Sequence, residues 1–169
     1  GMWGPNAQAV MDRVAEEPVT LGRFRAGPVT IAGVPAMALR VSYVGEHGWE
    51  IYAPVEYGVR LWDALREAGR DLGIAPAGLA AQDSLRLEKG YRLWGQDIHT
   101  EFDPFEAGLE FTVALDKGDF IGRDALVRKR DAGPPSRRLC ALVLDDRDTV
   151  VMNREPIFAS GGRGPEKVG

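Results

Sequence analysis

The stretch RVSYVGEHGWEIYAP, residues 40–54, gives the clearest indication of the fold of this chain. Aromatic and aliphatic residues alternate with polar ones on both sides of a glycine-containing turn at residues 45–48, which is typical of two half-buried antiparallel strands. We therefore predict a hairpin with one strand over residues 36–44 and a second over residues 49–53. Such a hairpin presents one row of side chains to the core and the other row to solvent or to a ligand.

Tyr43 and Glu50 are the two hairpin residues that we expect to bind a ligand. In an antiparallel hairpin, the numbers of two opposed residues always have the same sum. If the turn is centred between Glu46 and His47, Tyr43 therefore lies directly opposite Glu50, on the same face. A carboxylate beside a phenol suits a flat heterocycle with adjacent N–H donors, such as a pterin ring. Two alternatives remain open: Glu50 is solvated or paired with Arg40, or a slip of one residue separates the two side chains.

The rest of the chain contains the patterns of both helices and strands. Helical spacing of apolar residues predicts helices over residues 7–17, 55–72, 79–89 and 123–129. Short apolar or alternating runs predict further strands over residues 29–34, 108–115 and 139–144. This order of elements predicts an α+β fold, in which helices cover one face of an antiparallel sheet.

Residues 133–136, Gly-Pro-Pro-Ser, have the composition of a linker. We therefore predict one domain over residues 2–130 and the start of a second over residues 137–169, a stretch too short to form an independent core. The following residues are expected to be buried: Trp49, Trp62, Trp94 and Cys140. On the helix predicted over residues 79–89, we expect an ion pair between Asp83 and Arg86.

The composition excludes several classes of function. The formal net charge is -4 and the pI is about 5.3, and aspartates dilute the basic run at residues 128–130, so nucleic acid is not an expected partner. No stretch approaches the roughly 18 apolar residues of a membrane span, and no secretory signal is found, so we expect a cytoplasmic protein. His47, His99 and Cys140 lack the spacing of metal ligands, so that no metal is expected.

Several stretches, taken in order, resemble the glycine-cleavage T-protein family of aminomethyltransferases and the folate domains of dimethylglycine and sarcosine dehydrogenases. They are WGPN at residues 3–6, the hairpin sequence at residues 40–54, GLAAQDSLRLEKGYRLWGQD at residues 78–97, PFEAGL at residues 104–109 and FIGRDAL at residues 120–126. The resemblance extends over about residues 3–145.

The resemblance implies a protein that binds tetrahydrofolate. Proteins of this family are built of three domains around a central hole that holds tetrahydrofolate, and they transfer a one-carbon unit from a methylated or lipoyl-bound amine. The family motif places folate contacts at the positions of Tyr43 and Glu50. Gln82 stands where glycine-cleavage aminomethyltransferases usually have arginine, and its neutral amide can still form hydrogen bonds with the pterin. Together with residues 88–91, Gln82 makes the dehydrogenase-linked branch the more similar one.

The resemblance also implies that this chain is a fragment. Residues 2–130 match a folate-binding domain that lacks its N-terminal part, and residues 137–169 match the start of an incomplete C-terminal β-barrel domain. The catalytic aspartate of the family belongs upstream of the turn at residues 4–5, so we assign no catalytic residue and expect no catalysis by the chain alone. The alternative is a non-catalytic folate-binding or protein-interaction remnant of the same scaffold, which would self-associate through apolar surfaces left open.

Overall fold

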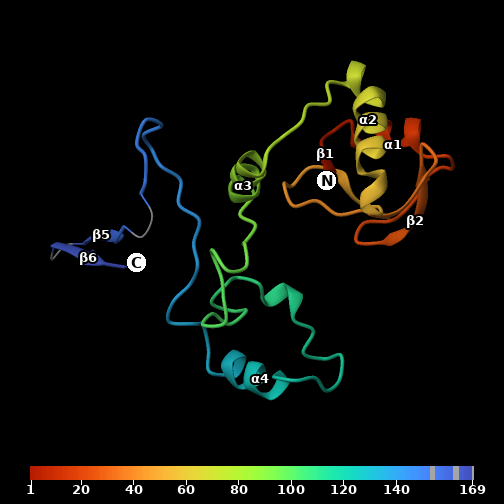
Figure 1. Cartoon of the computed structure of the whole chain (residues 1–169). Helices are drawn as coiled ribbons and strands as arrows, with labels where there is room; N and C mark the ends of the chain where they lie inside the picture. Colours follow the sequence, from red (N-terminus) through yellow and green to blue (C-terminus); the bar gives the residue numbers. More distant parts are fainter. Residues whose placement is uncertain (153–154, 162–163, 169) are drawn as a thin grey trace. The chain divides into compact units, whose positions relative to one another are not determined.

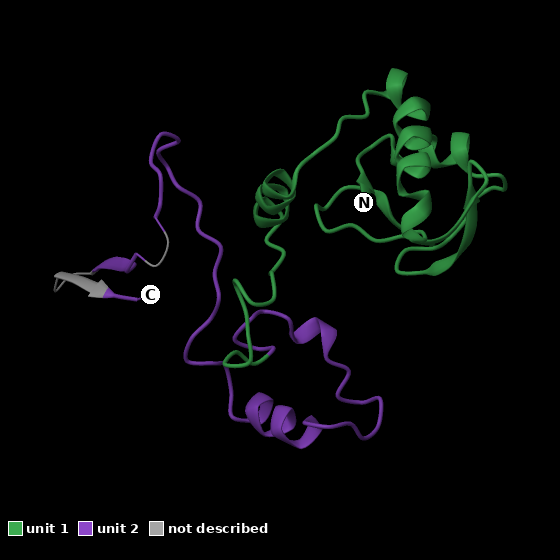
Figure 2. Ribbon diagram, viewed as in Figure 1, with its two compact units in different colours: residues 1–103 green, residues 104–169 purple. Residues whose placement is uncertain are grey.

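The computed structural model describes residues 1–152, 155–161 and 164–168 of the chain, which forms two compact units (Figure 2). The first unit comprises residues 1–103 and the second comprises residues 104–169. All three residues that were predicted to bind folate belong to the first unit.

A four-stranded antiparallel sheet with the strand order β1-β4-β3-β2 lies at the centre of the first unit. Its strands are β1 (Met2–Trp3), β2 (Ala26–Ile31), β3 (Val34–Leu39) and β4 (Gly48–Tyr52). The helices are α1 (Ala7–Val14), α2 (Gly58–Ala68) and α3 (Leu79–Glu88), with the short 3-10 helices η1 (Val55–Tyr57) and η2 (Arg70–Leu72). The prediction of an α+β fold is confirmed.

One face of the sheet is buried beneath α1 and α2 (Figure 1). Side chains alternate along each strand, so that Ala38 of β3 and Trp49 of β4 point into the core and have no exposed surface. Met11 of α1 and Leu61 of α2 pack into the same cluster. The other face of the sheet carries exposed side chains, among them Tyr52. Helices therefore cover one face, as the sequence predicted.

The hairpin between β3 and β4 has a different register from the predicted one. β3 ends at Leu39, and Leu39 lies directly opposite Glu50. Tyr43 lies beyond the end of β3, in the loop formed by residues 40–47. The prediction that Tyr43 opposes Glu50 is therefore wrong.

The wide loop between β3 and β4 is held by the N-terminal segment of the chain. The indole Nε1 of Trp3 donates a hydrogen bond to the Val41 carbonyl at 3.2 Å. The backbone N–H of Gly4 donates to the His47 carbonyl at 2.8 Å. These two hydrogen bonds tie both ends of the loop to the N-terminal segment.

Helix α2 buries Leu61, and Leu65 and Ala68 of the same helix pack against the core. Leu61 is buried, whereas Val59 and Trp62 are 76% and 54% exposed. The predicted helix over residues 55–72 is divided into η1, α2 and η2. The predicted burial of Trp62 is wrong, and so is that of Trp94, which is 66% exposed.

The described residues of the second unit contain three kinds of regular structure. They are the short helix η3 (Glu110–Thr112), the helix α4 (Arg123–Asp131), and a hairpin of β5 (Phe158–Gly161) and β6 (Gly164–Lys167). The helix predicted over residues 123–129 is confirmed as α4. Among the described residues of the whole chain, no helix has the length and apolar character that a membrane crossing requires.

Two predicted strands of the second unit are wrong. Residues 108–115 contain η3, and residues 139–144 have no regular structure. Cys140, which was expected to be buried, is exposed. A strand needs a partner for its backbone groups. The backbone hydrogen bond described for this stretch is the one from the Leu139 N–H to the Glu106 carbonyl, at 2.8 Å.

Candidate functional site

Glu50 lies in β4, on the face of the sheet opposite to the core. Its strand neighbours Trp49 and Ile51 point toward the core cluster, so alternation turns Glu50 the other way. The Tyr52 hydroxyl donates a hydrogen bond to Oε2 of Glu50 at 2.7 Å. This hydrogen bond, and then the charge of Glu50, raise the pKa of Tyr52 above its usual value. Glu50 is thus a half-buried acceptor held by a phenol on the same strand.

The surface around Glu50 is apolar. Leu39 lies directly opposite Glu50 on β3, and Met37 lies directly opposite Tyr52. Met37 is 42% exposed and Tyr52 is 57% exposed. These four side chains share one face of the sheet because opposed residues point the same way. We call this set, Met37, Leu39, Glu50 and Tyr52, the open-face cluster.

Tyr43 makes its contacts with the segment that follows α3. Its hydroxyl donates a hydrogen bond to the Arg92 carbonyl at 2.6 Å. Its ring stacks on that of Tyr91, with centroids 5.9 Å apart and an angle of 28° between the planes. The phenol beside Glu50 is therefore that of Tyr52, and sequence reasoning missed it because it assumed a tight turn.

Gln82 is a half-buried residue of α3 and lines a cavity of about 900 Å³ in the first unit. Other parts of the lining come from α2, from β4 through Ile51, and from the loop after β3 through Val44 and Glu46. Glu50 is not among the residues that line this cavity. Since Ile51 faces the cavity, its neighbour Glu50 faces the opposite side of the sheet. The structure does not bring Gln82 and Glu50 together in one pocket.

Arg86 forms a buried polar centre that sequence reasoning captured only in part. The side chain is on α3 and is 1% exposed. Nε donates to Asp83 at 2.7 Å, as predicted, and Nη1 donates to the Tyr91 carbonyl at 3.0 Å and to Asp97. Asp97 also accepts from the backbone N–H of Leu93 at 2.8 Å. The sequence predicts the pair with Asp83, which lies on the same helix as Arg86. It gives no indication of Asp97, the second carboxylate that binds this arginine.

The charge of Arg86 is maintained by its partners. Burial disfavours the charged guanidinium, but the hydrogen bonds to Asp83 and Asp97 outweigh this effect and raise the pKa of Arg86. Arg86 therefore remains a cation that ties α3 to the segment at residues 91–97. The same segment holds Tyr43 through the Arg92 carbonyl.

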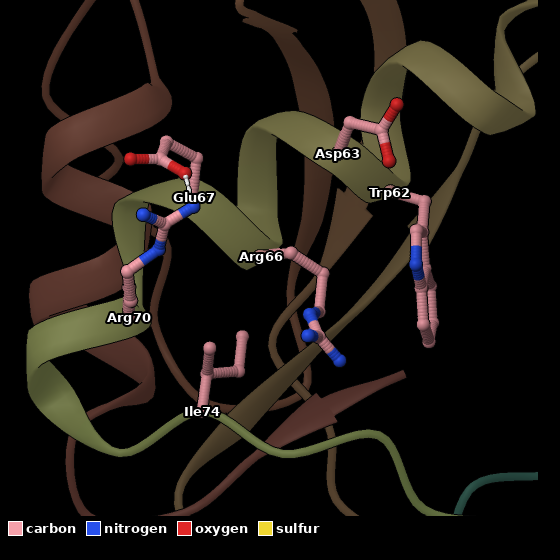
Figure 3. Close-up of a pocket in the computed structure, with 6 residues that line it drawn as sticks. All are labelled: Trp62, Asp63, Arg66, Glu67, Arg70 and Ile74. Atoms are coloured by element: carbon pink, nitrogen blue, oxygen red, sulfur yellow. Dashed lines mark hydrogen bonds and ion pairs between the residues drawn. The ribbon is translucent and has the colours of Figure 1, made fainter.

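A smaller cavity of about 550 Å³ lies beside α2 (Figure 3). It is lined by Trp62, Asp63, Arg66, Glu67, Arg70 and Ile74. Arg70 is paired with Glu67, and the guanidinium of Arg66 extends between Trp62 and Ile74 (Figure 3). Two arginines and two carboxylates line this cavity, so the formal charges of its lining balance. Elsewhere in the described residues, no group of three or more histidine, cysteine or acidic side chains could hold a metal ion.

The fold of this chain matches part of a solved aminomethyltransferase structure. The structure matches the crystal structure of the glycine cleavage system aminomethyltransferase T from Bartonella henselae with a TM-score of 0.63 and 32% sequence identity. The match covers 78% of this chain and 36% of that protein. A family described as the GCVT N-terminal domain matches residues 1–117. The chain belongs to this family.

Sequence relatives include transferases and an oxidase. An aminomethyltransferase from Caldanaerobacter subterraneus subsp. tengcongensis is 43% identical over 132 residues, which are 77% of this chain and 35% of the relative. One from Stenotrophomonas maltophilia is 42% identical and covers 95% of this chain and 44% of its own length. A 4-methylaminobutanoate oxidase (formaldehyde-forming) from Paenarthrobacter nicotinovorans is 42% identical over 95% of this chain and 20% of the relative. This chain thus spans less than half the length of these relatives.

Proposed function

We propose that this chain is part of a cytoplasmic, tetrahydrofolate-dependent one-carbon transferase of the aminomethyltransferase type. The observation that carries the proposal is the position of Glu50, a half-buried carboxylate on the face of the sheet away from the core, held by Tyr52. Membership of the aminomethyltransferase-related family supports it. In the complete protein, the one-carbon unit would come from a methylated or lipoyl-bound amine.

Glu50 has the chemistry to bind the edge of a pterin. One oxygen, Oε2, accepts the Tyr52 hydroxyl, and no other hydrogen bond to this carboxylate is found among the described residues. A carboxylate has about four lone-pair positions, so acceptor capacity remains for two parallel N–H donors. The amino group and the adjacent ring N–H of a pterin supply such a pair, and charge-assisted bonds of this kind are short and strong.

Tyr43 and Gln82 are the other folate contacts that we propose. The Tyr43 hydroxyl is already donated to the Arg92 carbonyl, so its contribution would come from the ring. Gln82 can both donate and accept, and its cavity of about 900 Å³ is in the size range of small-molecule sites. Because Glu50 and Gln82 face different sides, we propose that they contact different parts of the ligand.

Catalysis needs more than these contacts. A general acid or base must lie within hydrogen-bond reach of the reacting nitrogen, and we assign none of the described residues to that role. We therefore propose that the chain is a fragment that contributes to folate binding and is not catalytic alone. The alternative is a non-catalytic folate-binding or protein-interaction remnant of the same scaffold, which would show no turnover even when the other domains of the family are supplied.

The direct experiment is an anaerobic calorimetric titration of the 169-residue chain with tetrahydrofolate. The fold of the sample is first checked by circular dichroism. Saturable binding supports the proposal. A folded sample that releases no binding heat at millimolar tetrahydrofolate would exclude the chain as a folate site.

A further inference from the structure

We infer that Tyr52 is the aromatic partner of Glu50 in ligand binding, orienting its carboxylate and forming, with Met37, the platform on which a flat heterocycle rests. This inference deepens the proposed function and rests on it, because it presupposes that Glu50 binds the pterin. It assigns to Tyr52 the place beside Glu50 that the hairpin sequence alone had given to Tyr43.

The first support is the geometry of β4. Glu50 and Tyr52 are alternate residues of one strand, so their side chains leave the same face. The 2.7 Å hydrogen bond from the phenol fixes Oε2 of Glu50. A fixed carboxylate binds a pair of N–H donors better than a freely rotating one, because less side-chain entropy is lost on binding.

The second support is the exposure of the platform. The Tyr52 ring is 57% exposed although its hydroxyl is engaged, and Met37 directly opposite is 42% exposed. An aromatic ring with a methionine beside it forms a flat, polarisable apolar surface. A heterocycle that stacks on this surface brings its edge to the neighbouring carboxylate. The ligand class that fits is a planar heterocycle with adjacent N–H donors.

The third support is the direction of the hydrogen bond between Tyr52 and Glu50. The phenol donates and the carboxylate accepts, which leaves Glu50 as an acceptor toward a ligand. Tyr43 does not hold Glu50 in this arrangement. Its hydroxyl is donated to Arg92, and one face of its ring stacks on Tyr91.

Substitutions of Tyr52 separate the role of the hydroxyl from that of the ring. In the 169-residue chain, we expect Tyr52→Phe to weaken tetrahydrofolate binding about tenfold, because the hydrogen bond to a charged group is lost. Tyr52→Leu should weaken it further, since the platform is lost as well. Tyr57→Phe is the matched control, because Tyr57 lies in η1, outside the open-face cluster. This variant should bind tetrahydrofolate as the unchanged chain does.

A double-mutant comparison tests whether Tyr52 acts through Glu50. If the hydroxyl orients the carboxylate, Tyr52→Phe should have little further effect when Glu50→Gln is already present. Equal effects of Tyr52→Phe in both backgrounds would show that the hydroxyl does not act through Glu50 and would overturn the positioning role.

The outcomes distinguish this inference from the proposed function. If the unchanged chain binds tetrahydrofolate and Glu50→Gln weakens binding, while both Tyr52 variants bind normally, only the inference about Tyr52 is overturned. If the unchanged, folded chain does not bind at all, the proposed function fails and the inference fails with it.

Discussion

Arg86 on α3 forms an ion pair with Asp97, which follows eleven residues later in the chain. The arginine side chain is 2% exposed and that of Asp97 is 25% exposed. Through this pair, and through the hydrogen bond from Arg86 to the Tyr91 carbonyl, the segment after α3 is fixed against the helix. Arg86 therefore also fixes the place where Tyr43 is held.

Replacing Arg86 by methionine should destabilise the first unit strongly. The substitution leaves Asp97 and Asp83 without their cation, and breaking a buried pair in this way costs roughly 3 kcal/mol. Arg86→Lys should lose less, because a charge remains although it cannot reach all the acceptors. Urea unfolding followed by circular dichroism measures both. Equal midpoints for Arg86→Met and the unchanged chain would contradict the structural role of this residue.

Trp49 and Trp62 should respond very differently to truncation. Trp49 has no exposed surface, so Trp49→Ala should cost about 3–5 kcal/mol of unfolding free energy. Trp62 is 54% exposed and serves as the control, with an expected cost of about 1 kcal/mol or less. Trp49→Phe should cost less than Trp49→Ala, because phenylalanine leaves a smaller cavity and no hydrogen bond of the indole Nε1, which is buried without a partner in the described structure, is lost. A comparable loss for Trp62→Ala would show that the assigned core is wrong.

The phenol of Tyr52 should titrate above the usual value of about 10. The hydrogen bond to Glu50 and the charge of that carboxylate both favour the protonated phenol. The folded state therefore holds this proton more tightly than the unfolded state. Its contribution to stability is present below the usual pKa and is lost as pH rises through the raised one. Ultraviolet difference titration of tyrosine should show a lower pKa for Tyr52 in Glu50→Gln, and an unchanged titration would contradict the hydrogen bond.

The ion pair between Arg13 and Asp71 should make a small, pH-dependent contribution. Arg13 Nη2 donates to Asp71 at 3.1 Å, and this hydrogen bonding lowers the pKa of Asp71. The contribution is therefore present above the usual aspartate pKa of about 3.9 and is lost as pH falls through the lowered value. Asp71→Asn should lower the melting temperature slightly at pH 7. If the difference in melting temperature were as large near pH 2 as at pH 7, the ion pair would not be its cause.

The sequence predicted the elements better than their pairing. Strand β4 and helix α3 were recognised from local patterns, and the expected burial of Trp49 is confirmed. The register of the hairpin was not predicted, because a tight turn was assumed, whereas the loop is wide and contacts Trp3 and Gly4, which are distant in the sequence. The apolar run at residues 139–144 has a strand pattern, yet a strand also requires a partner that local sequence does not supply.

The candidate site was likewise predicted only in part. Glu50 was found from its place in the hairpin, but the phenol beside it was assigned to Tyr43 because a tight turn was assumed. A wider loop moves the end of β3 back to Leu39 and leaves Tyr52 as the neighbouring phenol. Asp97, the second carboxylate of Arg86, lies in an irregular segment whose path no local periodicity describes.

The most direct test of the proposed folate site is the affinity of the chain for tetrahydrofolate with and without the carboxylate of Glu50. Calorimetry should compare the unchanged chain with Glu50→Gln, which keeps the shape of the side chain and removes its charge. Glu56→Gln, in η1, is the matched control. We expect Glu50→Gln to weaken binding by about tenfold or more and Glu56→Gln to have no effect. Equal affinity of Glu50→Gln and the unchanged chain would contradict the assignment of Glu50 to the folate site.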